Sequence, residues 1–252
     1  MLTLSALSFS RSLRPAPELR VLAVFARACD LAAPDGQRVV ALVTPQVGDG
    51  PLNIVVAGLD RKLGAVQRGM TAAWQGDRLR LGPLLVSLDG AVPWEPRPDW
   101  VYLRRNRQRI AARLLLLREM VPNLKDLTGF LVPVRAVKSV DDLLALAGRG
   151  RGLTPAGDDF LMGWMLRAWL DHPAPEVVCR QVVEGAAPRT TTLAAAMLRA
   201  AARGECDAAW HALLSALAGD DAGTLAPAVE RVLAHGHTSG ADTLAGFLGF
   251  AQ

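Results

Sequence analysis

A glycine-rich loop that runs directly into a helix start is the part of this chain best suited to bind an anion. Residues 148–152 read Gly-Arg-Gly-Arg-Gly, and Thr154 and Pro155 follow as an expected helix cap and first helical residue. Glycine tolerates positive φ and close approach to a ligand, and the N–H groups of a helix N-terminus point toward the same place. The predicted ligand is a small phosphate or carboxylate, to which the two loop arginines add positive charge. The loop lacks the Gly-Lys-Ser/Thr sequence of a nucleotide-binding P-loop.

The helix start occurs twice, in the pattern Gly-x-Asp-x-x-x-Gly. One copy is residues 157–163 and the other is residues 240–246, and hydroxyl residues such as Thr154 and Ser239 precede them closely. Glycines six positions apart lie on roughly one side of a helix, so two such helices could pack closely. Two interpretations stay open. Either the aspartates face each other across one composite cleft, or each aspartate caps its own helix while the glycines serve packing.

Three consecutive threonines after Arg189, residues 190–192, form a second candidate anion-binding element. They lie at an expected helix start, where hydroxyls can cap free N–H groups and still leave one hydroxyl for a ligand. Simple capping explains the threonines as well, and it stays the alternative.

The predicted site combines these elements. Asp158 and Asp159 are the candidate catalytic residues, because a carboxylate can position an amide N–H. A carboxylate can also act as a general base, but nothing in the sequence indicates that role here. Arginine and backbone N–H donors would stabilise the negative charge of a bound anion or of a reacting group. The candidate substrate-binding residues are Gly150, Arg151, Gly152, Thr154, Gly157, Arg189, Thr190, Thr191, Ser239, Gly240 and Asp242.

Histidine and cysteine spacing predicts no metal site, and we expect no cofactor. Residues 235–237 read His-Gly-His without further nearby ligands, so His235 and Gly236 are better explained as a helix end. The three cysteines, Cys29, Cys179 and Cys206, lie far apart and contain no Cys-x-x-Cys spacing. This spacing favours reduced thiols in a cytoplasmic protein.

Composition excludes several function classes. The chain has 252 residues, 51% of them hydrophobic, which is enough for one large domain or two small ones. A net charge of +4 is mild, and the best basic cluster, residues 104–113, is interpreted as a solvated helix face. No stretch approaches the roughly 18 apolar residues of a membrane span. Composition therefore favours neither nucleic acid nor a membrane as a partner, and the predicted partner is the small anionic substrate of the glycine-rich loop.

The elements that must position the site are predicted to change from strands to helices near residue 100. Before it, β-branched runs separated by turns predict a small, mainly antiparallel sheet. Residues 93–98, with three prolines, are predicted to be a connection. The predicted strands are residues 21–25, 38–44, 53–57 and 78–87, the last of them broken at Gly82-Pro83.

After residue 100, helical spacing dominates, and Trp164, Trp169 and Trp210 are expected in the core or at an interface. The predicted helices are residues 140–147 capped by Ser139, one from Thr154 to Pro173, residues 190–203, 207–218 and 224–234, and one opened by Thr238 or Ser239. The predicted fold is therefore α+β. Its small β-rich region is residues 1–100, and its helical region, residues 101–252, carries the loop and both Gly-x-Asp motifs.

Several motifs together resemble one bacterial family. They are residues 152–161 (Gly-Leu-Thr-Pro-Ala-Gly-Asp-Asp-Phe-Leu), 189–193 (Arg-Thr-Thr-Thr-Leu), 203–205 (Arg-Gly-Glu) and 239–246 (Ser-Gly-Ala-Asp-Thr-Leu-Ala-Gly), with weaker marks at residues 35–36 and 50–55. In these motifs the chain resembles proteins of the oxamate carbamoyltransferase small-subunit type, known mainly as a domain of unknown function. The family loop usually reads Gly-x-Gly-Pro-Gly, whereas Arg151 stands at the proline position here.

The resemblance implies a function. Some members of the family are similar to one of three subunits that convert oxalurate and phosphate into oxamate and carbamoyl phosphate during anaerobic allantoin breakdown. On that basis we expect a subunit or homologue that binds phosphate, carbamoyl phosphate, oxamate or oxalurate at glycine-rich helix N-termini. It would act with other subunits or with further copies of itself. The alternative is a non-catalytic assembly subunit whose glycine motifs serve helix packing and partner contacts.

Overall fold

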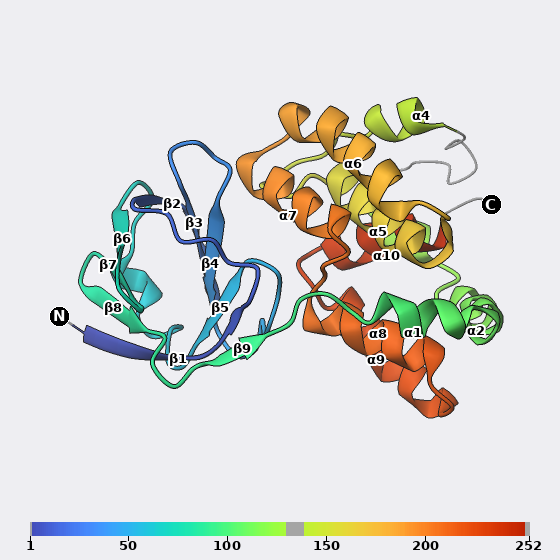
Figure 1. Cartoon of the computed structure of the whole chain (residues 1–252), viewed down its shortest axis with the longest axis horizontal. Coiled ribbons are helices and arrows are strands. Elements are labelled where there is room, and N and C mark those ends of the chain that lie inside the picture. The colour runs from blue at the N-terminus through green and yellow to red at the C-terminus, as the bar shows by residue number, and fades with distance from the viewer. Residues whose placement is uncertain (1, 130–138, 250–252) are drawn as a thin grey trace. The chain divides into compact units, whose positions relative to one another are not determined.

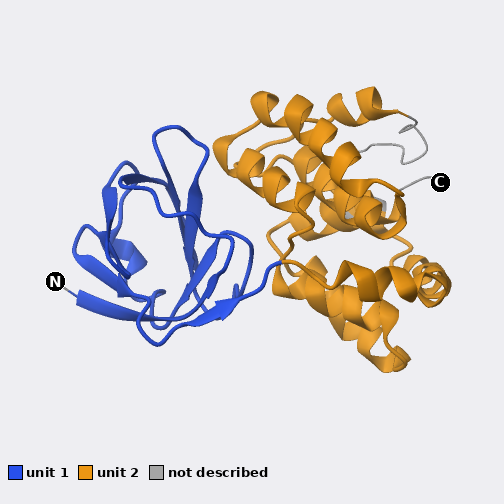
Figure 2. Cartoon of the chain, viewed as in Figure 1, with its two compact units in different colours: residues 1–96 blue, residues 97–252 orange. Residues whose placement is uncertain are grey.

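The computed structural model describes residues 2–129 and 139–249. The chain divides into two compact units, Met1–Pro96 and Arg97–Gln252, called unit 1 and unit 2 below (Figure 2). Strands come first and helices follow, which confirms the predicted α+β class (Figure 1).

Unit 1 is one sheet that closes into a barrel. In the described residues its strands are β1 (Leu2–Ser10), β2 (Leu19–Val24), β3 (Ala28–Ala32), β4 (Val39–Val43), β5 (Asn53–Val56), β6 (Thr71–Gln75), β7 (Arg78–Leu81), β8 (Leu84–Ser87) and β9 (Val92–Trp94). The strand order is β5-β4-β3-β2-β6-β7-β8-β1-β9, and β5 also pairs with β1, which closes the sheet. Most neighbouring strands are antiparallel, as predicted, but β1 runs parallel to β8 and β9, and β4 runs parallel to β5.

The assignment of residues 93–98 as a connection is wrong at its start. Ser8 of β1 lies opposite Val92 of β9, and Ser10 lies opposite Trp94. Pro93 is tolerated because β9 is last in the strand order, where a missing N–H breaks no ladder hydrogen bond. The strands β1, β3 and β6 were not predicted from the sequence.

Unit 2 is built around one buried helix. Its helices in the described residues are α1 (Trp100–Arg105), α2 (Arg107–Met120), α3 (Leu124–Leu127), α4 (Val140–Leu144), α5 (Ala156–Asp171), α6 (Pro175–Ala186), α7 (Thr192–Ala202), α8 (Ala208–Ala218), α9 (Leu225–Leu233) and α10 (Ser239–Leu248). Residues 156–170 of α5 are all buried, which is typical of a helix surrounded by others. The most extensive contact of α5 is with α10.

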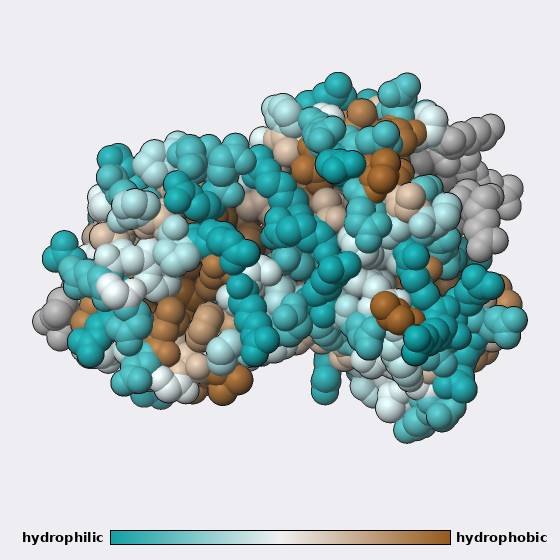
Figure 3. Space-filling view, in the orientation of Figure 1, coloured by the Kyte–Doolittle hydropathy of each residue, from teal (hydrophilic) through white to brown (hydrophobic). Residues whose placement is uncertain are grey.

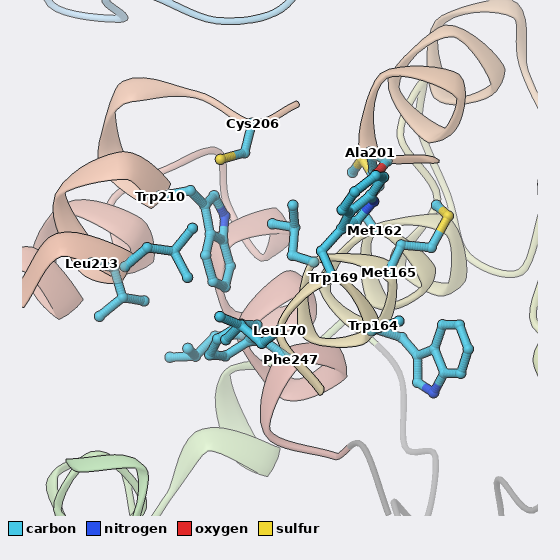
Figure 4. Close-up of a cluster of buried hydrophobic side chains, with 14 of the residues drawn as sticks. Met162, Trp164, Met165, Trp169, Leu170, Ala201, Cys206, Trp210, Leu213 and Phe247 are labelled. Carbon is cyan, nitrogen blue, oxygen red and sulfur yellow. The ribbon is translucent and has the colours of Figure 1, made fainter. Parts of the chain in front are cut away.

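Aromatic side chains fill the core of unit 2. Figure 4 shows Trp210 beside Phe247, and their ring centroids are 5.1 Å apart. Trp169 stacks on Trp100 at 5.8 Å. These tryptophans and Trp164 are buried, which confirms the expected core position. On the outside, hydrophilic residues cover much of the visible face of unit 2 (Figure 3).

Several predicted helix ends are confirmed by their capping contacts. Ser139 forms a reciprocal capping box with Asp142 at the start of α4. The Asp207 carboxylate accepts the N–H of Trp210 at 3.0 Å, at the start of α8. Gly204, after α7, has a φ of +75°, the left-handed conformation that favours glycine beyond a helix end. One predicted length is wrong, because α4 ends at Leu144.

The arginine cluster at residues 104–113 is not only a solvated face, which corrects the sequence-based interpretation. Arg104 donates from Nε to the carbonyl oxygen of Trp169 at 2.8 Å and from Nη2 to that of His172 at 3.1 Å. Two further arginines of the cluster bind carbonyl oxygens at the end of α8. The guanidinium groups thus satisfy carbonyls that a helix C-terminus leaves unpaired.

Arg113→Met is expected to destabilise unit 2 by about 3 kcal/mol, because the variant loses three charged hydrogen bonds and leaves the buried carbonyl oxygen of Ala216 without this donor. Arg113 is 8% exposed and donates to the carbonyl oxygens of Ala216, Asp220 and Asp221. Urea unfolding of the purified variant measures the loss. Arg107→Met, at an exposed position of the same helix, is the control. Equal losses in both variants would contradict this role of Arg113.

Candidate functional site

The two Gly-x-Asp helices, α5 and α10, are neighbours, as the composite-site interpretation expects. A Cβ atom added at Gly163 would overlap the carbonyl oxygen of Thr243, and one added at Gly246 would overlap that of Phe160. The contact is reciprocal. Gly163 meets Thr243, which lies three residues before Gly246, and Gly246 meets Phe160, which lies three residues before Gly163. These glycines therefore allow close backbone packing of the two helices.

The first glycine of each motif packs against the end of an earlier helical segment. A Cβ atom at Gly157 would overlap the carbonyl oxygen of Leu146, and one at Gly240 would overlap that of Val232. The same backbone contacts thus occur twice in unit 2, once between the α4 segment and α5 and once between α9 and α10. The repeat seen in the sequence is also a repeat of tertiary structure.

The glycine-rich loop folds back onto the start of α5. Gly148, Gly150 and Gly152 have φ angles of +70°, +121° and +92°, which confirms the predicted positive φ. A Cβ atom at Gly150 would lie 2.6 Å from the backbone nitrogen of Ala156, and one at Gly148 would overlap the carbonyl oxygen of Arg189. The loop is therefore held by backbone packing on both sides.

Asp158 already supplies an anionic group to this loop. Its Oδ1 accepts the N–H of Gly148 at 3.1 Å, and its Oδ2 accepts the hydroxyl of Thr190 at 2.6 Å. Burial raises the pKa of Asp158, while these two hydrogen bonds lower it. The N–H of Gly148 and the hydroxyl of Thr190 are thus already engaged in hydrogen bonds within the chain.

The prediction that Thr154 caps α5 is wrong. The helix begins at Ala156, and Pro155 is the N-cap residue, whose carbonyl oxygen accepts the N–H of Asp158 at 2.9 Å. The hydroxyl of Thr154 instead lies 3.3 Å from that of Ser239 on α10. This hydroxyl pair joins the starts of the two motif helices.

The capping interpretation of the threonine run is confirmed at Thr191. Its Oγ1 accepts the N–H of Ala194 at 3.1 Å at the start of α7 and also donates to the carbonyl oxygen of Leu153. The arginines expected at the site are more peripheral. Arg151 and Arg189 are exposed, and Arg189 donates from Nη1 to a backbone carbonyl at the end of α4.

Asp159 and Asp242, the equivalent aspartates of the two copies, come together inside unit 2. Each is 1% exposed, so these side chains do not line the open cleft that we expected. Asp242 Oδ1 accepts the N–H of Gly129 at 2.8 Å. Asp242 Oδ2 and both carboxyl oxygens of Asp159 have no well-aligned hydrogen bond in the described part of the chain. The Ser239 hydroxyl is close enough to lower the pKa of Asp159 without forming such a bond.

Burial raises the pKa of Asp159 to about 8, and the charges of Asp242 and Asp158 raise it as well. Asp159 therefore carries a proton at neutral pH and offers an O–H donor. Burial also raises the pKa of Asp242. Buried polar oxygens without partners are rare in folded proteins, and each one suggests a bound water or ligand.

Sequence reasoning did not identify Gly129 as part of this cluster. No local pattern marks it, because its contact with Asp242 joins positions 113 residues apart. The predicted residues Asp158 and Thr190 are in contact, and so are the hydroxyls of Thr154 and Ser239.

Residues 2–129 and 139–249 contain no group of three His, Cys, Asp or Glu side chains suited to hold a metal ion. His235 Nδ1 lies 3.8 Å from Asp207 Oδ2, and Gly236 has a φ of +63°, which fits the helix-end interpretation. The three cysteines are buried and free. In the described residues no helix is long and apolar enough to span a membrane.

Comparison with known proteins gives one family match. Residues 146–250 match the family model described as oxamate carbamoyltransferase subunit AllH. The matched segment contains the glycine-rich loop, both Gly-x-Asp helices and the threonine run. No solved structure matches the chain.

Proposed function

Because residues 146–250 belong to the family of oxamate carbamoyltransferase subunit AllH, we propose that this protein is a subunit of such an enzyme and that the starts of α5 and α10 bind its substrate. The substrates expected for this activity are phosphate, carbamoyl phosphate, oxamate and oxalurate. Oxamate and oxalurate each combine a carboxylate with amide N–H groups, so a site for them needs both hydrogen-bond donors and acceptors.

The cluster of buried carboxyl groups beside a positive-φ glycine loop carries this proposal. Asp242 Oδ2, which has no well-aligned hydrogen bond in the described part of the chain, would accept an amide N–H, and the protonated Asp159 would donate to a carbonyl oxygen. Remaining backbone donors of the loop and the exposed Arg151 would attract the carboxylate or phosphate. Donors and acceptors would thus meet the two ends of one small ligand.

Asp159 also suits proton transfer. In the reaction, the bond between the carbamoyl carbon and the oxamate nitrogen of oxalurate breaks while a phosphate oxygen bonds to that carbon. The leaving nitrogen takes up a proton, and phosphate loses one. A buried carboxylic acid with a pKa of about 8 is protonated at neutral pH and can exchange this proton in both directions.

One observation favours the alternative function, that of a non-catalytic assembly subunit. All four motif glycines lie against backbone carbonyl groups, and Asp158 is satisfied by its own chain. In that function the motifs would serve helix packing, and partner chains would contact other surfaces. The two functions differ in one measurable property, because only the first requires saturable binding of a small anion.

Thermal-shift and calorimetric titrations with the four expected substrates test the proposal. A ligand at 100 times its Kd stabilises the folded protein by about 2.7 kcal/mol, which raises Tm by several degrees. We expect at least one substrate to produce this rise. No shift and no binding heat with any of the four would favour the assembly subunit.

Gly152→Val is expected to weaken binding of the substrate at least tenfold, because valine distorts the path of the loop. Arg151→Ala is expected to weaken it about threefold, because it removes only a peripheral charge. No atom lies within 4 Å of a Cβ added at Gly152, so the strain comes from its φ of +92° alone. Gly58→Val in unit 1, also at positive φ with nothing within 4 Å, is the matched control. Unchanged affinity in a folded Gly152→Val protein would mean that the loop is structural.

A further inference from the structure

The start of the glycine-rich loop is held by residues 189–191, which lead into α7 and are called the clamp segment below. The Thr190 hydroxyl donates to one carboxyl oxygen of Asp158 at 2.6 Å, and the other carboxyl oxygen accepts the N–H of Gly148 at 3.1 Å. A Cβ atom at Gly148 would also overlap the carbonyl oxygen of Arg189, so the backbones of the loop and the clamp segment are in contact. The first residue of the loop is therefore fixed against both α5 and α7.

The end of the loop is held by the same segment. The Thr191 hydroxyl donates to the carbonyl oxygen of Leu153 and accepts the N–H of Ala194, so it binds the loop and caps α7 at once. Capping requires only the second of these hydrogen bonds, and it does not involve the Thr190 hydroxyl. The clamp segment thus makes more hydrogen bonds to the loop and to α5 than the capping of a helix explains.

Between these two attachments the loop keeps its own donors free. Among residues 2–129 and 139–249, no acceptor binds the backbone N–H groups of residues 150–153. Residues 150–152 are exposed, so this part of the loop is open to a ligand from solvent. Consecutive backbone N–H groups of this kind are a common binding element for phosphate and carboxylate groups. The clamp segment leaves these donors free because it holds the loop only at its two ends.

We propose that Thr190 and Thr191 are positioning residues of the substrate site, which hold the loop so that its free N–H groups meet a small phosphate or carboxylate. The proposal rests on the proposed function, in which this loop binds the substrate. Donors that are held in place before binding lose less freedom when the ligand arrives, and this strengthens binding.

The same contacts change the role expected for Asp158. Its carboxyl group links the N–H of Gly148 to the hydroxyl of Thr190, and the side chain is fully buried. Asp158 is therefore a positioning residue in this proposal, and it is not a catalytic one. Proton transfer is left to Asp159.

Limited digestion of the intact protein with trypsin tests the clamp without a ligand, because trypsin cleaves after Arg149 and Arg151 inside the loop. Mass spectrometry measures the rate of cleavage at these two bonds. Thr190→Val should be cleaved there at least tenfold faster than the wild type, because valine has the shape of threonine but cannot donate to Asp158. Thr190→Ser keeps the hydroxyl, and its rate should stay within about threefold of the wild-type rate.

Two comparisons separate opening of the loop from general unfolding. Thr224→Val is the matched control, because it removes a hydroxyl that donates to the carbonyl oxygen of Asp221 at 2.8 Å beside α9. The exposed Arg180 on α6 gives a reference cleavage site within the same chain. Equal cleavage of the loop in Thr190→Val and the wild type would overturn the proposal. A rate that rises as much at Arg180 as in the loop would overturn it as well.

Calorimetric titration with phosphate, carbamoyl phosphate, oxamate and oxalurate tests the effect on binding. For a substrate that binds the wild type, we expect the Kd to rise at least tenfold in Thr190→Val and to stay within about threefold in Thr190→Ser. Faster cleavage of the loop with an unaltered Kd would make the clamp a structural contact only and would overturn the positioning role. If the wild type binds none of the four, the proposed function fails and the positioning role fails with it, whereas the digestion rates still decide whether the clamp holds the loop.

Discussion

Gly163→Ala is expected to destabilise unit 2 by more than about 4 kcal/mol, although it adds a single methyl group. The new Cβ atom would overlap the carbonyl oxygen of Thr243, which belongs to the backbone of α10 and cannot rotate away. The helices α5 and α10 would have to separate, and this would open the packing around the most buried helix of the unit. Gly246→Ala should have a similar effect, because its Cβ atom would overlap the carbonyl oxygen of Phe160 in the same way.

Scanning calorimetry of the intact chain measures this loss, with two matched glycine-to-alanine controls. A Cβ atom at Gly185 would lie 2.6 Å from a methyl carbon of Leu144, a side chain that can change rotamer, and one at Gly64 would have no atom within 4 Å. The expected order of destabilisation is Gly163→Ala, then Gly185→Ala, then Gly64→Ala. If the Gly163→Ala and Gly64→Ala variants had the same Tm, the close packing of α5 against α10 would be contradicted.

Asp159→Asn is expected to alter how stability depends on pH. The pKa of Asp159 is raised from its ordinary value of 3.8 to about 8 in the folded protein, mainly by burial. Between these values the folded chain holds a proton that the unfolded chain has released. The free energy of unfolding of the wild type therefore falls as pH rises, by up to about 1.4 kcal/mol per pH unit from this group, until the folded pKa is passed. The amide of Asp159→Asn does not ionise, so the variant gains stability relative to the wild type across this window.

Urea unfolding of both proteins at intervals from pH 4.5 to pH 9 gives the difference directly. Asp158 and Asp242, whose pKa values are also raised, are present in both proteins, so the comparison isolates Asp159. Asp126→Asn, at an exposed position of α3, shows the effect of the same substitution away from the cluster. A stability difference that stays constant over the whole pH range would contradict a protonated Asp159.

The sequence by itself determined that a strand-rich region precedes a helical one, and it showed which motifs the chain carries. Strand runs such as residues 38–44 and helix caps such as Asp207 were predicted from neighbouring residues, because hydrophobic period and capping depend on local chemistry. The two Gly-x-Asp copies were also visible as a pattern, and their pairing followed from the small size of glycine. The family resemblance rested on the same motifs, and the match over residues 146–250 bears it out.

Only the tertiary structure decided which groups these motifs contact. Gly148 and Thr190 bind Asp158, and Gly129 binds Asp242, through contacts that join distant segments. The arginines of residues 104–113 were predicted to face solvent, yet three of them bind carbonyl groups at the ends of α5 and α8. Local propensity places an element along the chain, but it does not specify which helix end lies beside it. Burial follows from that packing, and burial is the main cause of the raised pKa of Asp159.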